Sequence, residues 1–354
     1  MAHDINKLLK LMRDENASDI HITANCTVQL RIDAKLAPVD DKILSPDEAK
    51  ALIYSILTKE QVSKFEDSLE LDMSFGVSDI SRFRVNVFKQ RGHVGCAIRL
   101  IPFEIMSFEQ CGLPVDIVIS LCNKPKGLVL VTGATGSGKS TTLAAMIDWI
   151  NSRKPCHIVT IEDPIEFVHT HKKAIVDQRE VYSDTRSFQE SLKHVLRQDP
   201  DVILIGEMRD LETIESALII AETGHLVFAT LHTSDCVQTI NRIVDVFPAY
   251  QQQQIRTQLS FVLLGNLSQQ LIPKMTGSGR VLATEVLIAN PAVRSLIRES
   301  KVHQLYSVIQ TSQKEGMKTM NQALYELYQK KLISYEEAFN RTTDTDDLNR
   351  IFNR

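Results

Sequence analysis

Residues 127–140 read Gly127-Leu128-Val129-Leu130-Val131-Thr132-Gly133-Ala134-Thr135-Gly136-Ser137-Gly138-Lys139-Ser140. The apolar run Gly127–Val131 predicts a buried strand, and a helical pattern follows at Thr141–Ile150. Between them lies a match to G-x-x-x-x-G-K-[ST], in the strand–loop–helix context that this motif requires. Backbone N–H groups of such a loop surround a phosphate, and the helix amino end adds positive charge. A glycine turn with an incidental lysine is the alternative. We expect a nucleotide site formed by Gly133, Ala134, Thr135, Gly136, Ser137, Gly138, Lys139, Ser140 and Thr141.

Two acidic clusters follow predicted strands further along the chain. Glu162, Asp163 and Glu166 come after the run Ile158–Ile161, and Glu207 comes after Val202–Ile205. Carboxyl ends of parallel strands meet at one sheet edge, where a carboxylate can hold a metal or orient the attacking water. Alternatively, Glu162 and Asp163 simply begin a turn before Pro164, or they pair with surface lysines. We predict that Ser140, Glu162, Asp163 and Glu207 are Mg²⁺ ligands and that Glu162 and Glu207 are also catalytic. Which of these two glutamates is the general base stays open.

Two histidines flank a fourth apolar run, Leu226–Leu231. Their odd spacing of seven residues sends them to opposite faces of a regular strand, so they cannot chelate one metal from it. His232 ends the run, where a γ-phosphate sensor would lie, and His225 begins it at the opposite end of the sheet or at its rim. A hydrogen-bonded structural role is the alternative for each.

Arginines are a further set of candidates, because they stabilise the charge on a transferring phosphoryl group, often from a neighbouring subunit. In the predicted strand Ser81–Gln90, Arg82 and Arg84 share one face, opposite Phe83, Val85 and Val87. A solvated face or an ion pair is the alternative for each arginine. The candidates are Arg82, Arg84 and Arg99 before residue 102, and Arg197 and Arg209 after it.

The chain of 354 residues has an expected organisation of two domains. Residues 1–101 predict an α+β domain, with strands at 19–23, 27–32, 71–77, 81–90 and 93–101 and a capping-box helix starting at Ser45-Pro46-Asp47-Glu48. Residues 102–114 interrupt the pattern and predict a linker. From residue 115, buried runs alternate with helices, as in a largely parallel α/β sheet. The region from 249 onward reads as mostly helical with a strand-like insert at 280–287, and 257–273 reads as a buried or interface helix.

Composition excludes a disordered, a collagen-like and a coiled-coil chain. The 43% hydrophobic and 24% charged residues are ordinary for a globular chain, and a formal charge of −4 gives no global footprint for nucleic acid. The six cysteines include no C-x-x-C pair, so we expect reduced thiols in a cytoplasmic protein. No signal peptide and no apolar run of membrane-spanning length is expected.

These motifs together resemble the secretion ATPases of type II secretion and type IV pilus systems, and most closely their pilus retraction motors. The resemblance covers essentially the whole chain. It rests on the glycine loop at 133–140, Ile161-Glu162-Asp163-Pro164-Ile165-Glu166-Phe167, Gly206-Glu207-Met208-Arg209-Asp210 and Thr223–Thr233. Residues 291–299 look like the AIRNLIRE motif of retraction ATPases, with Val293 and Ser295 as departures. Gly206 also departs from the common Walker B pattern, which has Asp there.

The resemblance implies a PAS-like N-terminal domain, a RecA-like P-loop ATPase domain and a homohexameric ring. ATP would lie between the two domains, with arginines of the first closing over the phosphates. The implied activity is ATP hydrolysis that powers pilus retraction and twitching motility, acting through a platform protein of the inner membrane. The implied place is the cytoplasmic face of that membrane. Glu162 and Glu207 would take the general-base and metal roles, and His225 and His232 become candidate catalytic residues.

Three alternatives remain at this point. An accessory retraction ATPase would share the same motifs. A RecA-like nucleic-acid translocase would share the loop and sheet, although the chain lacks a basic surplus and has a single Trp for base stacking. A nucleotide-gated scaffold would bind ATP without turnover, which the lone carboxylate after Val202–Ile205 leaves open.

Overall fold

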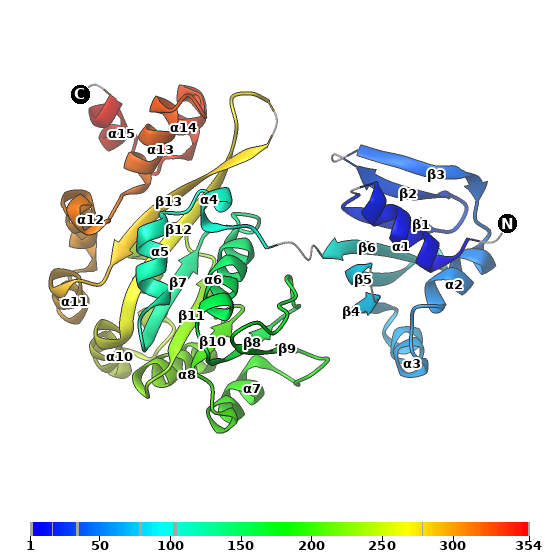
Figure 1. Cartoon of the computed structure of the whole chain (residues 1–354), viewed down its shortest axis with the longest axis horizontal. Coiled ribbons are helices and arrows are strands. Elements are labelled where there is room, and N and C mark those ends of the chain that lie inside the picture. The colour runs from blue at the N-terminus through cyan, green and yellow to red at the C-terminus, as the bar shows by residue number, and fades with distance from the viewer. Residues whose placement is uncertain are drawn as a thin grey trace. The chain divides into compact units, whose positions relative to one another are not determined.

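The computed structural model describes residues 3–15, 17–32, 35–77, 80–101, 105–277 and 279–352. The chain divides into two compact units (Figure 1), residues 1–104 with 166–168, and residues 105–165 with 169–354. Residues 102–104, the start of the predicted linker, lie outside the described residues. Residues 105–113 belong to the second unit, where Phe108 is buried and its ring stacks on Trp149 at 6.4 Å.

The first unit is built on a six-stranded sheet whose paired strands are all antiparallel. Phe83, Val85 and Val87 are fully buried, so the predicted alternation along their strand is confirmed. In sheet order the strands are β3 (Lys35–Ile43), β2 (Thr27–Ile32), β1 (Asp19–Thr23), β6 (His93–Ile101), β5 (Ser81–Gln90) and β4 (Glu70–Val77), and the helices are α1 (Ile5–Asp14), α2 (Pro46–Tyr54) and α3 (Lys59–Ser68).

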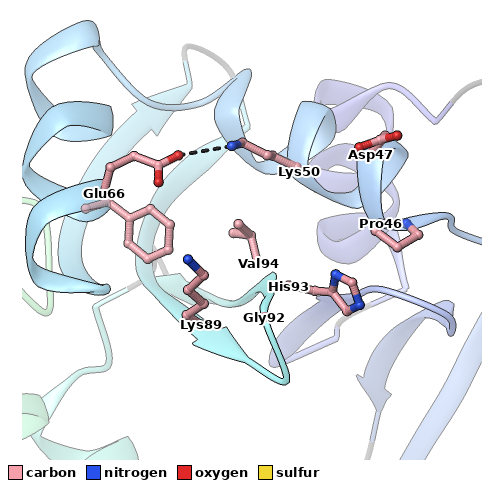
Figure 2. A pocket seen from close by; sticks show the side chains of 9 residues that line it. Pro46, Asp47, Lys50, Glu66, Lys89, Gly92, His93 and Val94 are labelled. Atoms are coloured by element: carbon pink, nitrogen blue, oxygen red, sulfur yellow. Dashed lines mark hydrogen bonds and ion pairs between the residues drawn. The ribbon is translucent and has the colours of Figure 1, made fainter.

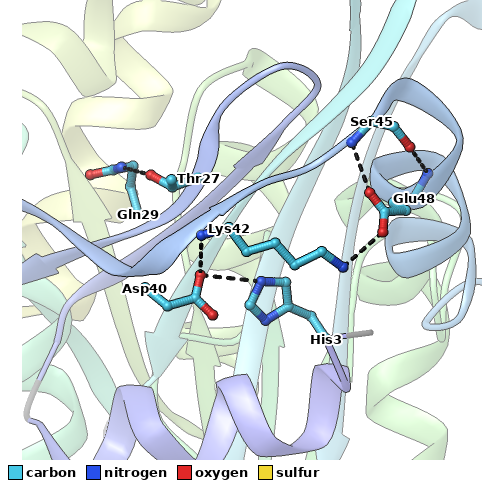
Figure 3. Close-up of polar contacts among 7 residues, drawn as sticks. All are labelled: His3, Thr27, Gln29, Asp40, Lys42, Ser45 and Glu48. Atoms are coloured by element: carbon cyan, nitrogen blue, oxygen red, sulfur yellow. Dashed lines mark hydrogen bonds and ion pairs between the residues drawn. The ribbon is translucent and has the colours of Figure 1, made fainter. Parts of the chain in front are cut away.

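The start of α2 shows how local sequence fixes an element in this unit (Figure 3). The Ser45 hydroxyl accepts the backbone N–H of Glu48, and the Glu48 carboxylate accepts the N–H of Ser45, at 3.2 and 2.9 Å. Lys42 adds an ion pair to Glu48 at 2.7 Å, and this contact together with the hydrogen bonds from Ser45 lowers the pKa of that carboxyl to about 2. The predicted capping box is therefore confirmed.

The second unit is built on a seven-stranded sheet in which β7, β8, β9, β10 and β11 run parallel. One face packs on α4, α5 and α6, and the other on α7, α8, α9 and α10. In sheet order the strands are β13 (Arg280–Ile288), β12 (Leu263–Pro273), β7 (Gly127–Thr132), β11 (Leu226–Leu231), β10 (Val202–Ile205), β8 (His157–Glu162) and β9 (Ile175–Glu180).

The helices of this unit cover both sheet faces and continue beyond β13 as a C-terminal group (Figure 1). In this part of the chain, no helix formed by the described residues combines the length and apolar character that a membrane span requires. The helices are α4 (Phe108–Cys111), α5 (Val115–Cys122), α6 (Lys139–Arg153), α7 (Phe188–Val195), α8 (Leu211–Glu222), α9 (Cys236–Asp245), α10 (Ala249–Val262), α11 (Pro291–Arg298), α12 (Leu305–Thr311), α13 (Met320–Gln329), α14 (Tyr335–Arg341) and α15 (Thr345–Phe352).

One expected element is wrong. Residues 257–273 were expected to be a single helix, but α10 ends at Val262 and β12 runs from Leu263 to Pro273. Strand β12 pairs parallel with β7 and antiparallel with β13, so both of its edges are covered. Its polar side chains Asn266, Ser268 and Gln269 are buried, and the Gln269 amide donates to the Thr142 hydroxyl at 2.8 Å. Buried polar residues hide the apolar pattern by which a central strand is recognised.

Candidate functional site

The glycine loop connects the end of β7 to the start of α6, in the predicted strand–loop–helix arrangement. Gly133 has a φ of 141°, and a Cβ there would lie 2.4 Å from the Gln269 carbonyl oxygen, so only glycine fits. Residues 134–136 at the tip are exposed, while Gly138 caps the helix in a left-handed conformation. The loop backbone and the amino end of a 15-residue helix therefore lie together, as in sites that bind a phosphate.

Lys139, the first residue of α6, is held inside this loop. Its side chain is buried, and its ammonium group donates to the carbonyl oxygens of Gly133 and Ala134 at 2.8 and 3.1 Å. Ser140 and Thr141 follow in the first helical turn and are half-buried. A positive charge and two hydroxyls thus stand beside the orphan N–H groups of the helix end.

Four loops meet at the carboxyl edge of the sheet. The strands β7, β11, β10 and β8 are consecutive neighbours and parallel, so the residues that follow each of them lie along one edge. This order brings together Gly133, His232, Glu207 and Glu162, as the sequence predicts for the last three.

Glu207, at this edge, contacts both His232 and Arg209. One oxygen contacts His232 Nε2 at 3.1 Å, and the other accepts from the guanidinium of Arg209 at 2.7 Å. Burial works to raise the pKa of Glu207, but the Arg209 hydrogen bond and the His232 ring hold it below its usual value. Glu207 is therefore ionised at neutral pH. Arg209, a candidate for contact with a phosphoryl group, is paired with Glu207 in this structure.

Glu162 ends β8 and is held by two neutral donors. Its Oε1 accepts from the Thr160 hydroxyl at 2.7 Å and from the Gln178 amide at 3.3 Å. Gly206 lies beside it on the neighbouring strand end, where a Cβ would be 3.2 Å from the Glu162 Cα and from the Ile161 carbonyl. The glycine at the usual Walker B aspartate position is thus explained by close approach of the two strand ends.

Thr160 and Gln178 are site residues that the sequence reasoning missed. Gln178 lies on β9, which showed no strand pattern because its segment mixes Asp177, Arg179 and Glu180 with apolar residues. In the sheet, Thr160 and Gln178 are direct cross-strand partners. Thr160 could have been found from the sequence, because it lies two residues before Glu162. Alternation along a strand therefore places the two side chains on the same face.

His225 lies apart from this edge. It precedes β11 at the amino end of the strand, and its ring contacts the Ile220 carbonyl at 3.1 Å, at the end of α8. The expectation that the two histidines occupy opposite strand ends is confirmed, and a catalytic role for His225 stays a prediction. Asp163, Glu166 and Arg197 are all exposed side chains.

The arginines of the first unit share one face of its sheet. Arg84 and Arg99 are direct cross-strand partners, and Arg82 lies two residues before Arg84. Arg99 donates to Asp19 at 2.8 Å, and Arg82 donates to the Ser74 hydroxyl at 2.7 Å. Burial works to raise the pKa of Asp19, yet hydrogen bonds from Ser18 and Arg99 lower it overall. This face therefore carries a row of cations opposite the core face.

The donor set at the sheet edge fits a magnesium ion. Ser140, Glu162, Asp163 and Glu207 all offer oxygen, which Mg²⁺ prefers, and Mg²⁺ commonly uses few protein ligands together with water and phosphate oxygens. Among the described residues no group of three or more His, Cys, Asp or Glu side chains is arranged as a metal site.

A small pocket in the first unit has a different character (Figure 2). Its volume is about 170 Å³, and it lies between α2, α3 and the turn that joins β5 to β6. Lys50 and Glu66 form an ion pair at 3.0 Å at its rim, with Asp47, Lys89 and His93 also in the lining. Acids and bases balance in this lining, and we assign the pocket no function.

The family model described as Type II/IV secretion system protein matches residues 1–340. The chain belongs to this family. The resemblance inferred from its motifs is therefore confirmed.

Three curated relatives span nearly the same length. The type IV pilus retraction ATPase PilT of Pseudomonas aeruginosa is 50% identical and covers 95% of this chain and 97% of its own. A twitching motility protein of Neisseria gonorrhoeae is 45% identical, covering 98% and 93%. The type IV pilus ATPase PilU of P. aeruginosa is 41% identical, covering 98% and 90%.

A solved structure shares the fold over almost the whole chain. The pilus retraction motor PilT with bound ADP has a TM-score of 0.93 and 51% identity, covering 98% of this chain and 99% of its own. The mixed α/β fold expected from the sequence is thereby confirmed.

Proposed function

We propose that this chain is an ATP-hydrolysing motor that powers retraction of type IV pili, and with it twitching motility. The observation that carries the proposal is one sheet edge. There the glycine loop, Glu162 and the Glu207–His232 pair follow neighbouring parallel strands, in a chain 50% identical to a pilus retraction ATPase. A sheet edge with a phosphate loop, carboxylates and a histidine has the parts that hydrolysis of ATP needs.

The side chains divide the work as follows. Backbone N–H groups of residues 133–141 bind the phosphates, and Lys139 turns from its own loop carbonyls to the β- and γ-phosphates. The Ser140 hydroxyl, with Asp163 and one of Glu162 and Glu207, is the ligand set for Mg²⁺, which supplies neutralisation of phosphate charge when bound. The other glutamate accepts the proton of the attacking water, whose oxygen joins the γ-phosphorus as ADP leaves. His232 senses the γ-phosphate.

In this proposal the first unit is a PAS-like domain, expected over residues 1–101, and the second is a RecA-like ATPase domain, expected over residues 115–354. Residues 105–113 of the expected 102–114 linker belong to the second unit, so the ATPase domain begins before residue 115. Six copies form a ring. The two domain types are supported by the antiparallel sheet of the first unit and the largely parallel sheet of the second. Arg82, Arg84 and Arg99 close over the nucleotide, since their shared cationic face offers the charge that a phosphoryl group attracts.

The motor acts on a platform protein at the cytoplasmic face of the inner membrane, with no nucleic acid involved. The formal charge of −4 supports the absence of nucleic acid in this proposal, because proteins bind nucleic acid through cationic surfaces. An accessory retraction ATPase is the second candidate. The departures at Val293 and Ser295 favour it, while the identity of 50% to PilT against 41% to PilU favours the main motor.

A deletion strain tests the proposal. Loss of a retraction motor should leave surface pili present but unable to retract, and twitching should stop. Complementation with the parent chain should restore twitching, whereas Lys139→Ala should not. The matched control is Lys126→Ala, an exposed lysine just before β7. Pili absent from the deletion strain, or twitching restored by Lys139→Ala, would contradict the proposal.

A further inference from the structure

One buried carboxylate caps two helices. Glu285 on β13 is 3% exposed, and its Oε1 accepts the backbone N–H of Cys236 at 2.8 Å. Its Oε2 accepts the backbone N–H of Met320 at 3.2 Å. These are the first residues of α9 and α13. Each N–H is an orphan donor of its helix, so Glu285 satisfies both ends with one side chain.

The two helices belong to different parts of the second unit. Helix α9 begins directly after residues 232–235, the loop that carries His232 from the end of β11 toward Asp235, the cap of α9. Helix α13 opens the last helices of the chain, and Val286, next to Glu285, exchanges two backbone hydrogen bonds with Lys318 just before it. The Glu285 side chain thus joins the loop of His232 to the C-terminal helices.

A buried polar cluster connects the same loop to the strand before the glycine loop. The Thr132 and Ser268 hydroxyls are 2.8 Å apart, and Asn266 donates to Ser268 at 3.2 Å and to Thr239 at 3.3 Å. Thr239 in turn contacts the Thr233 hydroxyl at 2.6 Å. Because Thr132 directly precedes Gly133, this cluster links the base of the glycine loop to the first turns of α9.

Stability is a poor explanation for this carboxylate. Burial raises the pKa of Glu285, even though the N–H groups it accepts act in the opposite direction. An acid whose folded pKa is raised holds its proton more tightly when folded, so its ionised form opposes folding at neutral pH. The positive ends of two helices offset part of this penalty. A buried carboxylate of this kind is better explained by a need to hold both helices together.

We propose that Glu285 is a positioning residue that couples the His232 loop to helix α13, so that the state of the nucleotide is transmitted to the C-terminal helices. The inference rests on the proposed place of His232 at the nucleotide. Glu285 itself touches no reacting atom. It keeps the start of α9 in place, and through it the loop that faces the γ-phosphate.

The first test compares Glu285→Gln with Asp347→Asn. Glutamine keeps the size but turns an NH₂ group toward one of the two N–H donors, so one helix start loses its acceptor. We expect kcat for ATP to fall about tenfold, with KM within about twofold, as a displaced catalytic loop predicts. Asp347 is a matched buried carboxylate whose partners Tyr306, Gln310 and Asn321 all lie in the C-terminal helices. Its variant should lose stability but keep kcat.

The second test measures coupling directly by hydrogen exchange on the full-length chain. A non-hydrolysable ATP analogue should slow exchange at residues 232–240 and at 319–324 in the parent. In Glu285→Gln the first segment should still respond and the second should not. Protection of both segments in the variant, or no response at 319–324 in the parent, would overturn the coupling. A parent that neither binds nor hydrolyses ATP would instead overturn the proposed function, so the two failures are distinguishable.

Discussion

Gly206 shows at the residue scale why this site departs from the common Walker B pattern. A Cβ at this position would lie 3.2 Å from the Cα of Glu162, which ends the neighbouring strand. An aspartate at 206 would therefore crowd the backbone that carries the Glu162 side chain. The glycine at 206 and the glutamate at 162 are therefore explained by the same close packing of two strand ends.

Gly206→Asp is accordingly expected to lower ATP turnover rather than to improve it. The neighbouring backbone must give by a few tenths of an ångström, so the expected loss of rate is below the about 100-fold that a misplacement of about 1 Å costs. Steady-state ATPase assays on the purified variant measure this. Gly76→Ala is the control, because a Cβ there meets nothing within 4 Å. Unchanged or faster turnover in Gly206→Asp would show that Glu162 is not held where the structure has it.

His169 gives a pH dependence of stability. Burial lowers its pKa to about 4, below the usual value of 6.5. As the pH falls below about 6.5, the unfolded chain takes up a proton that the folded chain does not, so this stability is present above that pH and is lost on acidification. The slope approaches about 1.4 kcal/mol per pH unit between about pH 6 and pH 4.

Urea unfolding of the parent and of His169→Gln at pH 7 and pH 5 measures this contribution. The parent should lose more stability than the variant over that interval. Equal losses in the two proteins would mean that His169 titrates normally in the folded state.

The element scale shows where sequence reasoning succeeds and where it does not. The parallel strands β7, β10 and β11 are apolar runs bounded by turn residues, and all were predicted within a residue of their bounds. Strand β12 was mistaken for helix because it carries Asn266, Ser268 and Gln269 into the core, where they form hydrogen bonds with Thr239, Thr132 and Thr142, residues far away in the sequence. Tertiary hydrogen bonds of this kind leave no local signal.

Strand β3 was missed for another reason. It is the edge strand of the first sheet, it contains Pro38, and Leu36 and Ile43 are exposed. An edge strand needs no buried face and tolerates proline, so its sequence shows neither alternation nor an apolar run. The glycine loop and the paired residues Glu207 and His232 were found because their chemistry requires specific residue types, whereas Thr160 and Gln178 act only through their position.

Gly265→Ala distinguishes the strand from the helix that its sequence suggests. A Cβ at residue 265 would lie 2.9 Å from the Leu287 carbonyl oxygen on β13. The variant should therefore lose about 1–3 kcal/mol of stability, as overpacked cores do. In a helix the same change would add about 1 kcal/mol. Chemical denaturation of the two proteins decides the sign, and a stabilised variant would contradict the β12 assignment.

At the scale of the whole molecule, the proposal requires six copies that share nucleotide sites. Native mass spectrometry with ATP should show assemblies of about six times 39.9 kDa. Arg84→Ala should assemble equally but lose turnover by about 1,000-fold or more, as expected when an arginine that stabilises phosphoryl transfer is removed. Lys89→Ala, on the same strand but the opposite face, is the control. Full ATP turnover in Arg84→Ala would show that Arg84 does not contact the nucleotide during hydrolysis.

The division of the chain into two units followed from a change in pattern, from short antiparallel runs to buried strands alternating with helices. Assembly, by contrast, leaves no such pattern in a single sequence, because a surface that is buried by another copy has the composition of ordinary surface. The ring and its platform partner therefore rest on the family, and the nucleotide site rests on residues that can be named.

The most direct test of the account is a crystal structure of this chain with Mg²⁺ and a non-hydrolysable ATP analogue. We expect the β- and γ-phosphates to lie against the backbone N–H groups of residues 134–141, with Lys139 moved from the Gly133 and Ala134 carbonyls to the phosphates. A nucleotide bound elsewhere, with Lys139 still donating to those carbonyls, would contradict it.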